Sequence, residues 1–129
     1  MIYLVTGQLE LYTPVGYSMA TVEESLEYLE TLEVIGFDTE TRGFDPYTKE
    51  LLSMQLGDGE KQYVIDCLSI NPKLYKDILE RKELIMHNAK FDLRFLYYQG
   101  IVPTKVFDTF LIEESLQQVL IQLEDLLMQ

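Results

Sequence analysis

The chain has 129 residues, 47% of them hydrophobic, with a single cysteine and a formal net charge of −12, a composition typical of one globular domain. So acidic a chain is not expected to bind a long nucleic-acid duplex tightly alone, because basic residues supply much of that affinity, but metal ions can let it hold a few terminal nucleotides. The lone Cys67 fits a reducing cytoplasm, the location we expect, and no apolar run approaches the roughly 18 residues of a membrane span, so we expect no membrane partner.

The first half of the chain predicts mostly strands. In order, we expect a strand, a helix, a second strand and a β-hairpin, at residues 2–5, 21–32, 33–38, and 51–56 with 62–65. Thr21 and Glu24 form a capping box at the start of the helix, whose apolar residues recur at helical spacing. Two glycines in the segment 57–61 provide the turn of the hairpin.

The second half alternates between helices and strands. We expect a helix, a strand, a helix, a strand and a last helix at residues 71–81, 84–86, 88–100, 102–107 and from 108 onward. Asn71 before Pro72 is typical of a first helical turn, Gly100 of a helix end and Asp108 of a helix N-cap. Three successive strands followed by this alternation predict an α/β fold, with a mixed sheet flanked by helices in a single domain over residues 1–129.

The most informative segment is 34–41, where an apolar strand ends in Asp38 and Glu40. Side chains two residues apart on a strand point to the same face, so these two carboxylates project together. Neighbouring carboxylates repel each other unless a cation neutralises them. Hard cations such as Mg²⁺ take oxygen ligands of this kind. The alternative is a solvated strand end that runs into an acidic turn.

A third acidic residue lies in the segment 87–92, which reads His-Asn-Ala-Lys-Phe-Asp. Asn88 and Asp92 are four residues apart, so they share one face of the first turn of the helix predicted there. A folded sheet can bring Asp92 to the same place as Asp38 and Glu40. The alternative is that Asp92 only interacts favourably with the positive end of the helix dipole.

Three segments together resemble the motifs of a known family: Phe-Asp-Thr-Glu-Thr at 37–41, His-Asn-Ala-Lys-Phe-Asp at 87–92 and Phe-Asp-Thr-Phe-Leu at 107–111. They are similar to those of the DnaQ-like 3′→5′ exonucleases of the RNase H-like superfamily, in particular the proofreading domain of family A DNA polymerases and RNase D. The resemblance extends from about Val5 to Asp125. It implies an RNase H-like fold and hydrolysis of the terminal phosphodiester of single-stranded DNA, with release of nucleoside 5′-monophosphates.

The resemblance also implies a cofactor, two Mg²⁺ or Mn²⁺ ions. Asp38 matches the residue that bridges both ions, and Glu40 matches the one that binds the ion activating water. Asp92 matches the residue that contacts the other ion. In such a two-metal mechanism one ion orients the attacking hydroxide and the other stabilises the departing 3′ oxygen.

Three further residues match substrate-binding positions of the family. Asn88 matches an asparagine that helps to position the substrate end. Phe44 matches an apolar residue that wedges against the terminal base. Thr39 matches a residue whose main chain contacts the terminal nucleotide. The expected partner is therefore a single-stranded DNA 3′ end.

The chain departs from the family pattern near its C-terminus. The family has a fourth carboxylate, an aspartate that follows a tyrosine or histidine on a late helix, and no such pair follows Tyr98. Asp125 has Ile121 four residues before it, where the tyrosine belongs. We therefore expect a C-terminally truncated domain that works with a DNA polymerase domain or a complementary C-terminal fragment. Alone, it is expected to cleave slowly or not at all, because acid–base help and metal placement each contribute orders of magnitude.

Other functions remain open at this point. Nothing in the sequence senses a 2′-hydroxyl, so an RNase D-like exonuclease acting on RNA is an alternative. A second alternative is a catalytically inactive relative that serves as a metal-binding or polymerase-docking module, which the missing fourth carboxylate favours. A nucleotide-binding α/β domain is weakly supported, because the chain has no glycine-rich phosphate loop.

Overall fold

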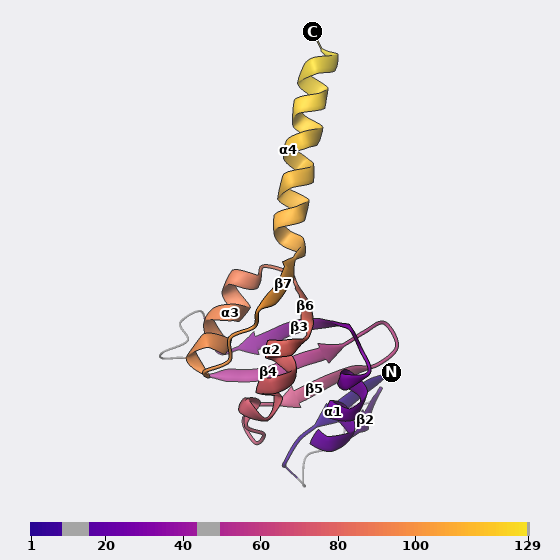
Figure 1. Cartoon of the computed structure of the whole chain (residues 1–129), viewed down its shortest axis with the longest axis vertical. Coiled ribbons are helices and arrows are strands. Elements are labelled where there is room, and N and C mark those ends of the chain that lie inside the picture. Colours follow the sequence, from indigo (N-terminus) through magenta and orange to yellow (C-terminus); the bar gives the residue numbers. More distant parts are fainter. Residues whose placement is uncertain (9–15, 44–49, 129) are drawn as a thin grey trace.

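The computed structural model describes residues 1–8, 16–43 and 50–128 and folds them around one mixed seven-stranded sheet (Figure 1). The strands are β1 (Ile2–Val5), β2 (Tyr17–Met19), β3 (Val34–Thr41), β4 (Leu51–Gly57), β5 (Gln62–Asp66), β6 (Glu83–Met86) and β7 (Lys105–Asp108). They lie in the order β2-β1-β5-β4-β3-β6-β7. The predicted α/β fold with a mixed sheet is confirmed.

Strand β3 lies between an antiparallel and a parallel neighbour. β3, β4 and β5 form an antiparallel succession that includes the predicted β-hairpin, and β6 and β7 extend the sheet in parallel. β3 does not end at residue 38 as predicted, because its ladder with β4 continues through the pairs Asp38–Gln55 and Glu40–Ser53. The register is irregular only between Glu40 and Thr41. Both acids therefore lie inside the last part of the strand.

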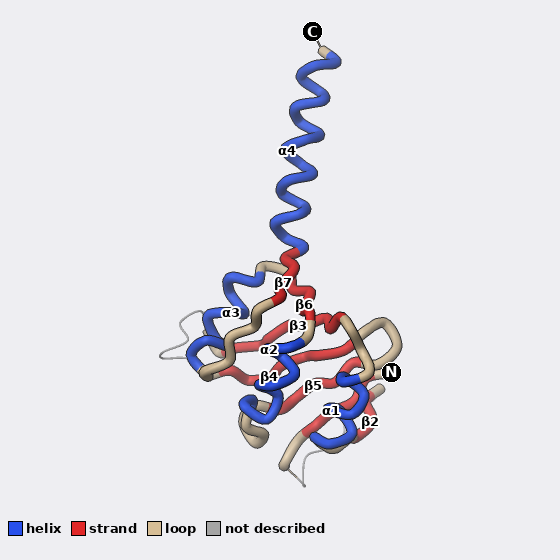
Figure 2. The backbone as a smooth tube through the Cα atoms, in the orientation of Figure 1, coloured by secondary structure: helices blue, strands red, loops and turns tan. Residues whose placement is uncertain are grey.

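The helices are α1 (Val22–Glu30), α2 (Lys76–Arg81), α3 (Ala89–Tyr98) and α4 (Thr109–Leu127), with a 3₁₀ turn η1 (Pro72–Tyr75) before α2. Figure 2 shows how these helices and the strands follow one another. Thr21 Oγ1 accepts a hydrogen bond from the Glu24 main-chain N–H at 3.0 Å, as an N-cap does. Asn71 Oδ1 does the same for Lys73 N, but the helix expected over 71–81 begins as a 3₁₀ turn. Gly100, with φ +79°, ends α3.

One face of the sheet is covered by helices α1, α2 and α3. A single cluster of buried side chains joins Leu29 of α1, Ile78 and Leu79 of α2 and Phe95 and Leu96 of α3 to the sheet. The strand residues that meet them alternate along each strand, as the pleat requires: Ile35, Phe37, Met54, Leu56, Tyr63, Ile65, Leu84 and Met86. We call this side the helix-covered face.

The opposite side of β3, β4, β6 and β7 is exposed in the described chain, and we call it the open face. The residues that alternate with the buried ones are Asp38, Glu40, Gln55, Glu83, Ile85 and Phe107, all of them exposed. Gly36, Ile85 and Phe107 pair in register across β3, β6 and β7. Helix α4 does not return to cover this face but projects away from the sheet beyond β7 (Figure 1).

Two further differences from the sequence predictions have simple causes. β2 was not predicted, because its three residues are too few for a periodic pattern. The strand expected over 102–107 starts at Lys105, since Pro103 has no N–H to donate to the ladder. In the part of the chain that the structure describes, no helix is both long and apolar enough to cross a lipid bilayer.

Candidate active site

Strand β3 carries the first two acids of the candidate site. Asp38 and Glu40 are exposed, whereas Thr39 between them is only 7% exposed. By strand alternation, the two acids project from the open face and Thr39 from the helix-covered face. The Thr39 main-chain N–H donates to Asp38 Oδ1 at 2.9 Å, which fixes the orientation of that carboxylate.

Helix α3 brings the third acid next to β3, on the helix-covered side of the strand. Asp92 lies in the first turn of α3 and is 3% exposed. The hydroxyl of Thr39 donates to Asp92 Oδ1 at 2.5 Å, a link between residues 53 apart in the chain. The segments 37–41 and 87–92, which the sequence singled out independently, therefore meet through Thr39.

Asp92 is electrostatically unfavourable as a bare carboxylate. Burial raises its pKa to about 6, and the nearby charges of Asp38, Asp108 and Glu40 contribute in the same direction, while the hydrogen bond from Thr39 opposes them. Its second oxygen, Oδ2, is buried without a hydrogen-bond partner. A buried carboxylate oxygen in this situation is stabilised by a proton or by a cation.

The donor chemistry of these acids suits a hard divalent cation, because carboxylate oxygens are the ligands that Mg²⁺ prefers. The buried, unpartnered Oδ2 of Asp92 supports this fit. Within residues 1–8, 16–43 and 50–128, however, no group of three or more acidic, histidine or cysteine side chains lies close enough together to hold an ion. The assignment of Asp38, Glu40 and Asp92 as metal ligands therefore stays a prediction.

The predicted substrate-binding residues have different surroundings. Thr39 is buried, with its side chain engaged by Asp92. Asn88 is exposed and immediately precedes α3, but its backbone is left-handed, with φ 62°, and its side chain does not cap the helix. Phe44 lies outside the described residues. The substrate roles of all three remain predictions.

The residue that caps α3 is Asp108, from the end of β7. Its Oδ1 accepts from Asn88 N at 3.0 Å and its Oδ2 from Ala89 N at 2.8 Å. The same Oδ1 accepts from Phe110 N at 2.9 Å, which confirms Asp108 as the predicted N-cap of α4. No local pattern predicts the first role, because the bonded residues lie about 20 positions apart and meet only through the pairing of Met86 with Asp108.

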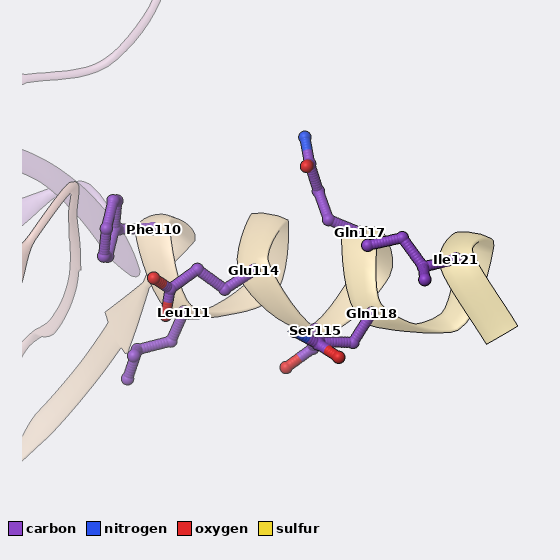
Figure 3. Close-up of a pocket in the computed structure, with 7 residues that line it drawn as sticks. All are labelled: Phe110, Leu111, Glu114, Ser115, Gln117, Gln118 and Ile121. Atoms are coloured by element: carbon purple, nitrogen blue, oxygen red, sulfur yellow. The ribbon is translucent and has the colours of Figure 1, made fainter.

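A hollow of about 770 Å³ lies away from these acids, along α4. It is lined only by residues of that helix: Phe110, Leu111, Glu114, Ser115, Gln117, Gln118 and Ile121 (Figure 3). The described apolar side chains of α4 after Phe110 are at least 50% exposed. Since one helix cannot enclose a ligand, we assign no small-molecule site there.

Comparison with known proteins decides the family. The sequence model of the 3′-5′ exonuclease family found in A-type DNA polymerases matches residues 17–129, which include all three motifs. The chain belongs to this exonuclease family. It is also 34% identical over 89 residues to DNA polymerase I of Aquifex aeolicus (strain VF5), a match that covers 68% of this chain and 15% of the polymerase.

Three solved structures share the fold of this chain. Escherichia coli RNase D, an exoribonuclease involved in structured RNA processing, is 30% identical with a TM-score of 0.57 over 67% of this chain and 24% of that one. The catalytic core of Trypanosoma brucei RRP6 has a TM-score of 0.64 at 24% identity over 84% and 29%. Brucella melitensis NrnC with bound Mg²⁺ has a TM-score of 0.53 at 24% identity over 84% and 48%. The chain thus spans less than half of each of these structures, and its fold is RNase H-like.

Proposed function

We propose that the chain is a 3′→5′ exonuclease domain that hydrolyses the terminal phosphodiester of a single-stranded nucleic acid with two divalent metal ions. The observation that carries the proposal is the hydrogen bond from Thr39 to Asp92. It joins the acidic strand to the acidic helix turn, so Asp38, Glu40 and Asp92 lie close enough for the charges of the first two to act on the third. Membership of the exonuclease family supports the reaction type.

The residues of this chain would share the work as follows. Asp38 and Glu40 on the open face would hold the ions, with Asp38 oriented by the Thr39 N–H. Asp92 would contribute its unpartnered Oδ2 from α3. Bound Mg²⁺ or Mn²⁺ would supply an activated water and stabilise the charge that develops on the leaving oxygen. Below about pH 6, Asp92 holds a proton that competes with a cation, so the proposed activity falls in acid.

Single-stranded DNA is the substrate that we propose. The relationship to DNA polymerase I supports a proofreading-type domain. The relationship to E. coli RNase D supports RNA as the second candidate. The net charge of −12 predicts weak binding that depends on metal ions and weakens with salt. The protein is proposed to act in the cytoplasm.

We further propose that the domain functions together with another segment, either a polymerase domain or a complementary C-terminal fragment. Two features of the described chain support this. The exposed Ile85 and Phe107 lie on the same face as Asp38 and Glu40, and α4 presents apolar residues along its length. A segment that covered both surfaces would lie beside Asp38 and Glu40, where it could supply a fourth carboxylate and a group that orients water. Without this segment, few side chains hold the metal ions in place, so the chain alone is expected to cleave its substrate slowly.

A catalytically inactive relative that serves as a polymerase-docking module is the alternative, and one observation favours it. The described residues form no group of three or more metal-binding side chains. The two candidates differ in what they predict for an oligonucleotide, since an exonuclease site recognises a free 3′ end and a docking module does not.

Fluorescence anisotropy with a short labelled single strand tests this difference. We expect the chain to bind a strand with a free 3′-hydroxyl in Mn²⁺, and to lose that binding with EDTA or with Asp38→Ala. A strand blocked by a 3′-phosphate should bind less well. The affinities for a DNA and an RNA single strand of the same sequence rank the two candidate substrates. Binding that is equal for free and blocked ends, or unaffected by Asp38→Ala, contradicts the exonuclease proposal.

A further inference from the structure

Asp108 lies at a joint between the two segments that follow β6 and β7. Strands β6 and β7 run parallel, with Met86 opposite Asp108. The chain passes from β6 through His87 and Asn88 into α3, and from β7 directly into α4. The carboxylate of Asp108 accepts main-chain N–H groups from both helix starts, Asn88 and Ala89 for α3 and Phe110 for α4.

Helix α3 depends on this carboxylate because it has no cap of its own. The residue at its N-cap position, Asn88, makes no side-chain hydrogen bond to the helix and has a left-handed backbone. The first N–H groups of a helix have no partner inside it, and they need one from elsewhere. Asp108 supplies that partner from another strand, and the N–H groups hold the pKa of its carboxyl below the ordinary value against the effect of burial.

A second set of contacts fixes the same joint. The Thr109 hydroxyl donates to the Met86 carbonyl at 3.2 Å and lies 3.0 Å from His87 Nδ1. The His87 ring contacts Phe110 edge-on, with 5.5 Å between ring centroids. The turn that leads into α3 is therefore held on the Asp108–Phe110 segment at several points, and Asp92 follows within one helical turn.

We propose that Asp108 is a positioning residue for the acidic site: it fixes the start of α3 and thereby the place of Asp92 against Thr39 and the β3 acids. Because α4 shares the same carboxylate, the position of α4 is linked to that of Asp92. This inference rests on the proposed function only where metal binding is concerned. The placement of α3 is a separate property that can be measured in the metal-free protein.

The test compares Asp108→Ala with Thr21→Ala, which removes the N-cap of α1 far along the chain. Without metal, we would record the amide exchange of Asn88 and Ala89 and the methyl resonance of Thr39. For each protein we would also measure the Mn²⁺ midpoint, the Mn²⁺ concentration that gives half of the maximal rise in melting temperature. We expect Asp108→Ala to lose protection at both amides, to shift the Thr39 methyl resonance and to raise the Mn²⁺ midpoint about tenfold or more. Thr21→Ala should lower the melting temperature and leave all three unchanged.

Asp108→Asn provides a graded variant, because its amide keeps one acceptor oxygen where the carboxylate had two. It is expected to retain the bonds to Asn88 and Phe110, to lose the one to Ala89 and to give an intermediate shift of the Thr39 methyl resonance. If Asp108→Ala leaves the two amides protected, or leaves the Thr39 resonance where Thr21→Ala leaves it, the positioning role is wrong. If the wild-type chain shows no Mn²⁺ effect, the proposed function fails, and the exchange and methyl measurements still decide the positioning role.

Discussion

The two faces of the sheet differ in what covers them and in what they carry. On the helix-covered face, three helices bury alternate residues of β3, β4, β5 and β6 in one cluster. The open face carries Asp38 and Glu40 on β3 and the exposed Ile85 on β6 and Phe107 on β7. The first face accounts for folding and the second holds the proposed chemistry. Asp92 connects them, since it is buried with the helices yet affected by the charges of the open face.

The two faces should differ most in how much a substitution lowers the free energy of unfolding, and two neighbouring residues of β6 test this. Leu84 is fully buried, whereas Ile85 is 39% exposed on the open face. Leu84→Ala should lower the free energy of unfolding by about 2–5 kcal/mol, because it removes core contacts and leaves a cavity. Ile85→Ala should cost less than about 1 kcal/mol. Chemical denaturation measures both, and equal losses would show that the open face is covered in solution.

Metal binding should act through the open face. At a concentration about 100-fold above the dissociation constant, Mn²⁺ or Mg²⁺ should stabilise the protein by about 2.7 kcal/mol, as any ligand of the native state does. Asp38→Ala should abolish this gain. Glu27→Ala, which removes an exposed acid on α1, serves as the matched control and should keep it. Equal melting-temperature shifts in wild type and Asp38→Ala would mean that the β3 acids hold no ion.

Asp92 should destabilise the metal-free fold above about pH 6. Burial raises the pKa of Asp92 from 3.8 to about 6, so between these two pH values the native state binds more protons than the unfolded state. The free energy of unfolding therefore falls as the pH rises from 3.8 to about 6. Asp92→Asn removes this penalty and should raise the free energy of unfolding by about 1–3 kcal/mol at pH 8. At pH 4 or below, where Asp92 is largely protonated in the native state, the gain should be small. Urea titrations at both pH values measure it, and a gain that does not change with pH contradicts the assignment.

The smallest effect is expected on α4. Leu123 is 50% exposed on α4, a helix that projects away from the sheet, so Leu123→Gln should change the free energy of unfolding by less than about 0.5 kcal/mol. Leu29→Gln on α1 is the contrasting variant, because Leu29 is fully buried and its replacement should be strongly destabilising. A large loss from Leu123→Gln in the chain alone would show that α4 already has a partner, such as a second copy.

What the sequence predicted well depends on local signals. The caps at Thr21, Asn71 and Asp108 and the end at Gly100 were read from residues within one helical turn, and the structure shows each of them. The acidic strand and the start of α3 were found in the same way. Their meeting through Thr39 was expected only in outline, because it is a contact between distant segments.

The open face was not predicted, for a physical reason. Leu84, Ile85 and Met86 form a continuous apolar run, which does not tell which side chain a helix will cover. The cap of α3 was missed because Asp108 reaches Asn88 and Ala89 across two parallel strands. The residues that remain predictions, Phe44 among them, are those whose roles depend on a substrate or a metal ion.

The central claim is that the acids of β3 and α3 form a 3′→5′ exonuclease site that needs a further segment on the open face. The most direct measurement is release of 5′-mononucleotides from a 3′-labelled single strand in Mn²⁺. It compares the 129-residue chain, the same chain fused to the segment that follows the matched region of the Aquifex aeolicus polymerase, and the fusion carrying Asp38→Ala or Glu40→Ala. We predict slow or no release by the chain, faster release by orders of magnitude with the fusion, and loss of release in both variants. A folded fusion without Asp38-dependent release contradicts the exonuclease claim, and robust Asp38-dependent release by the chain alone contradicts the need for a further segment.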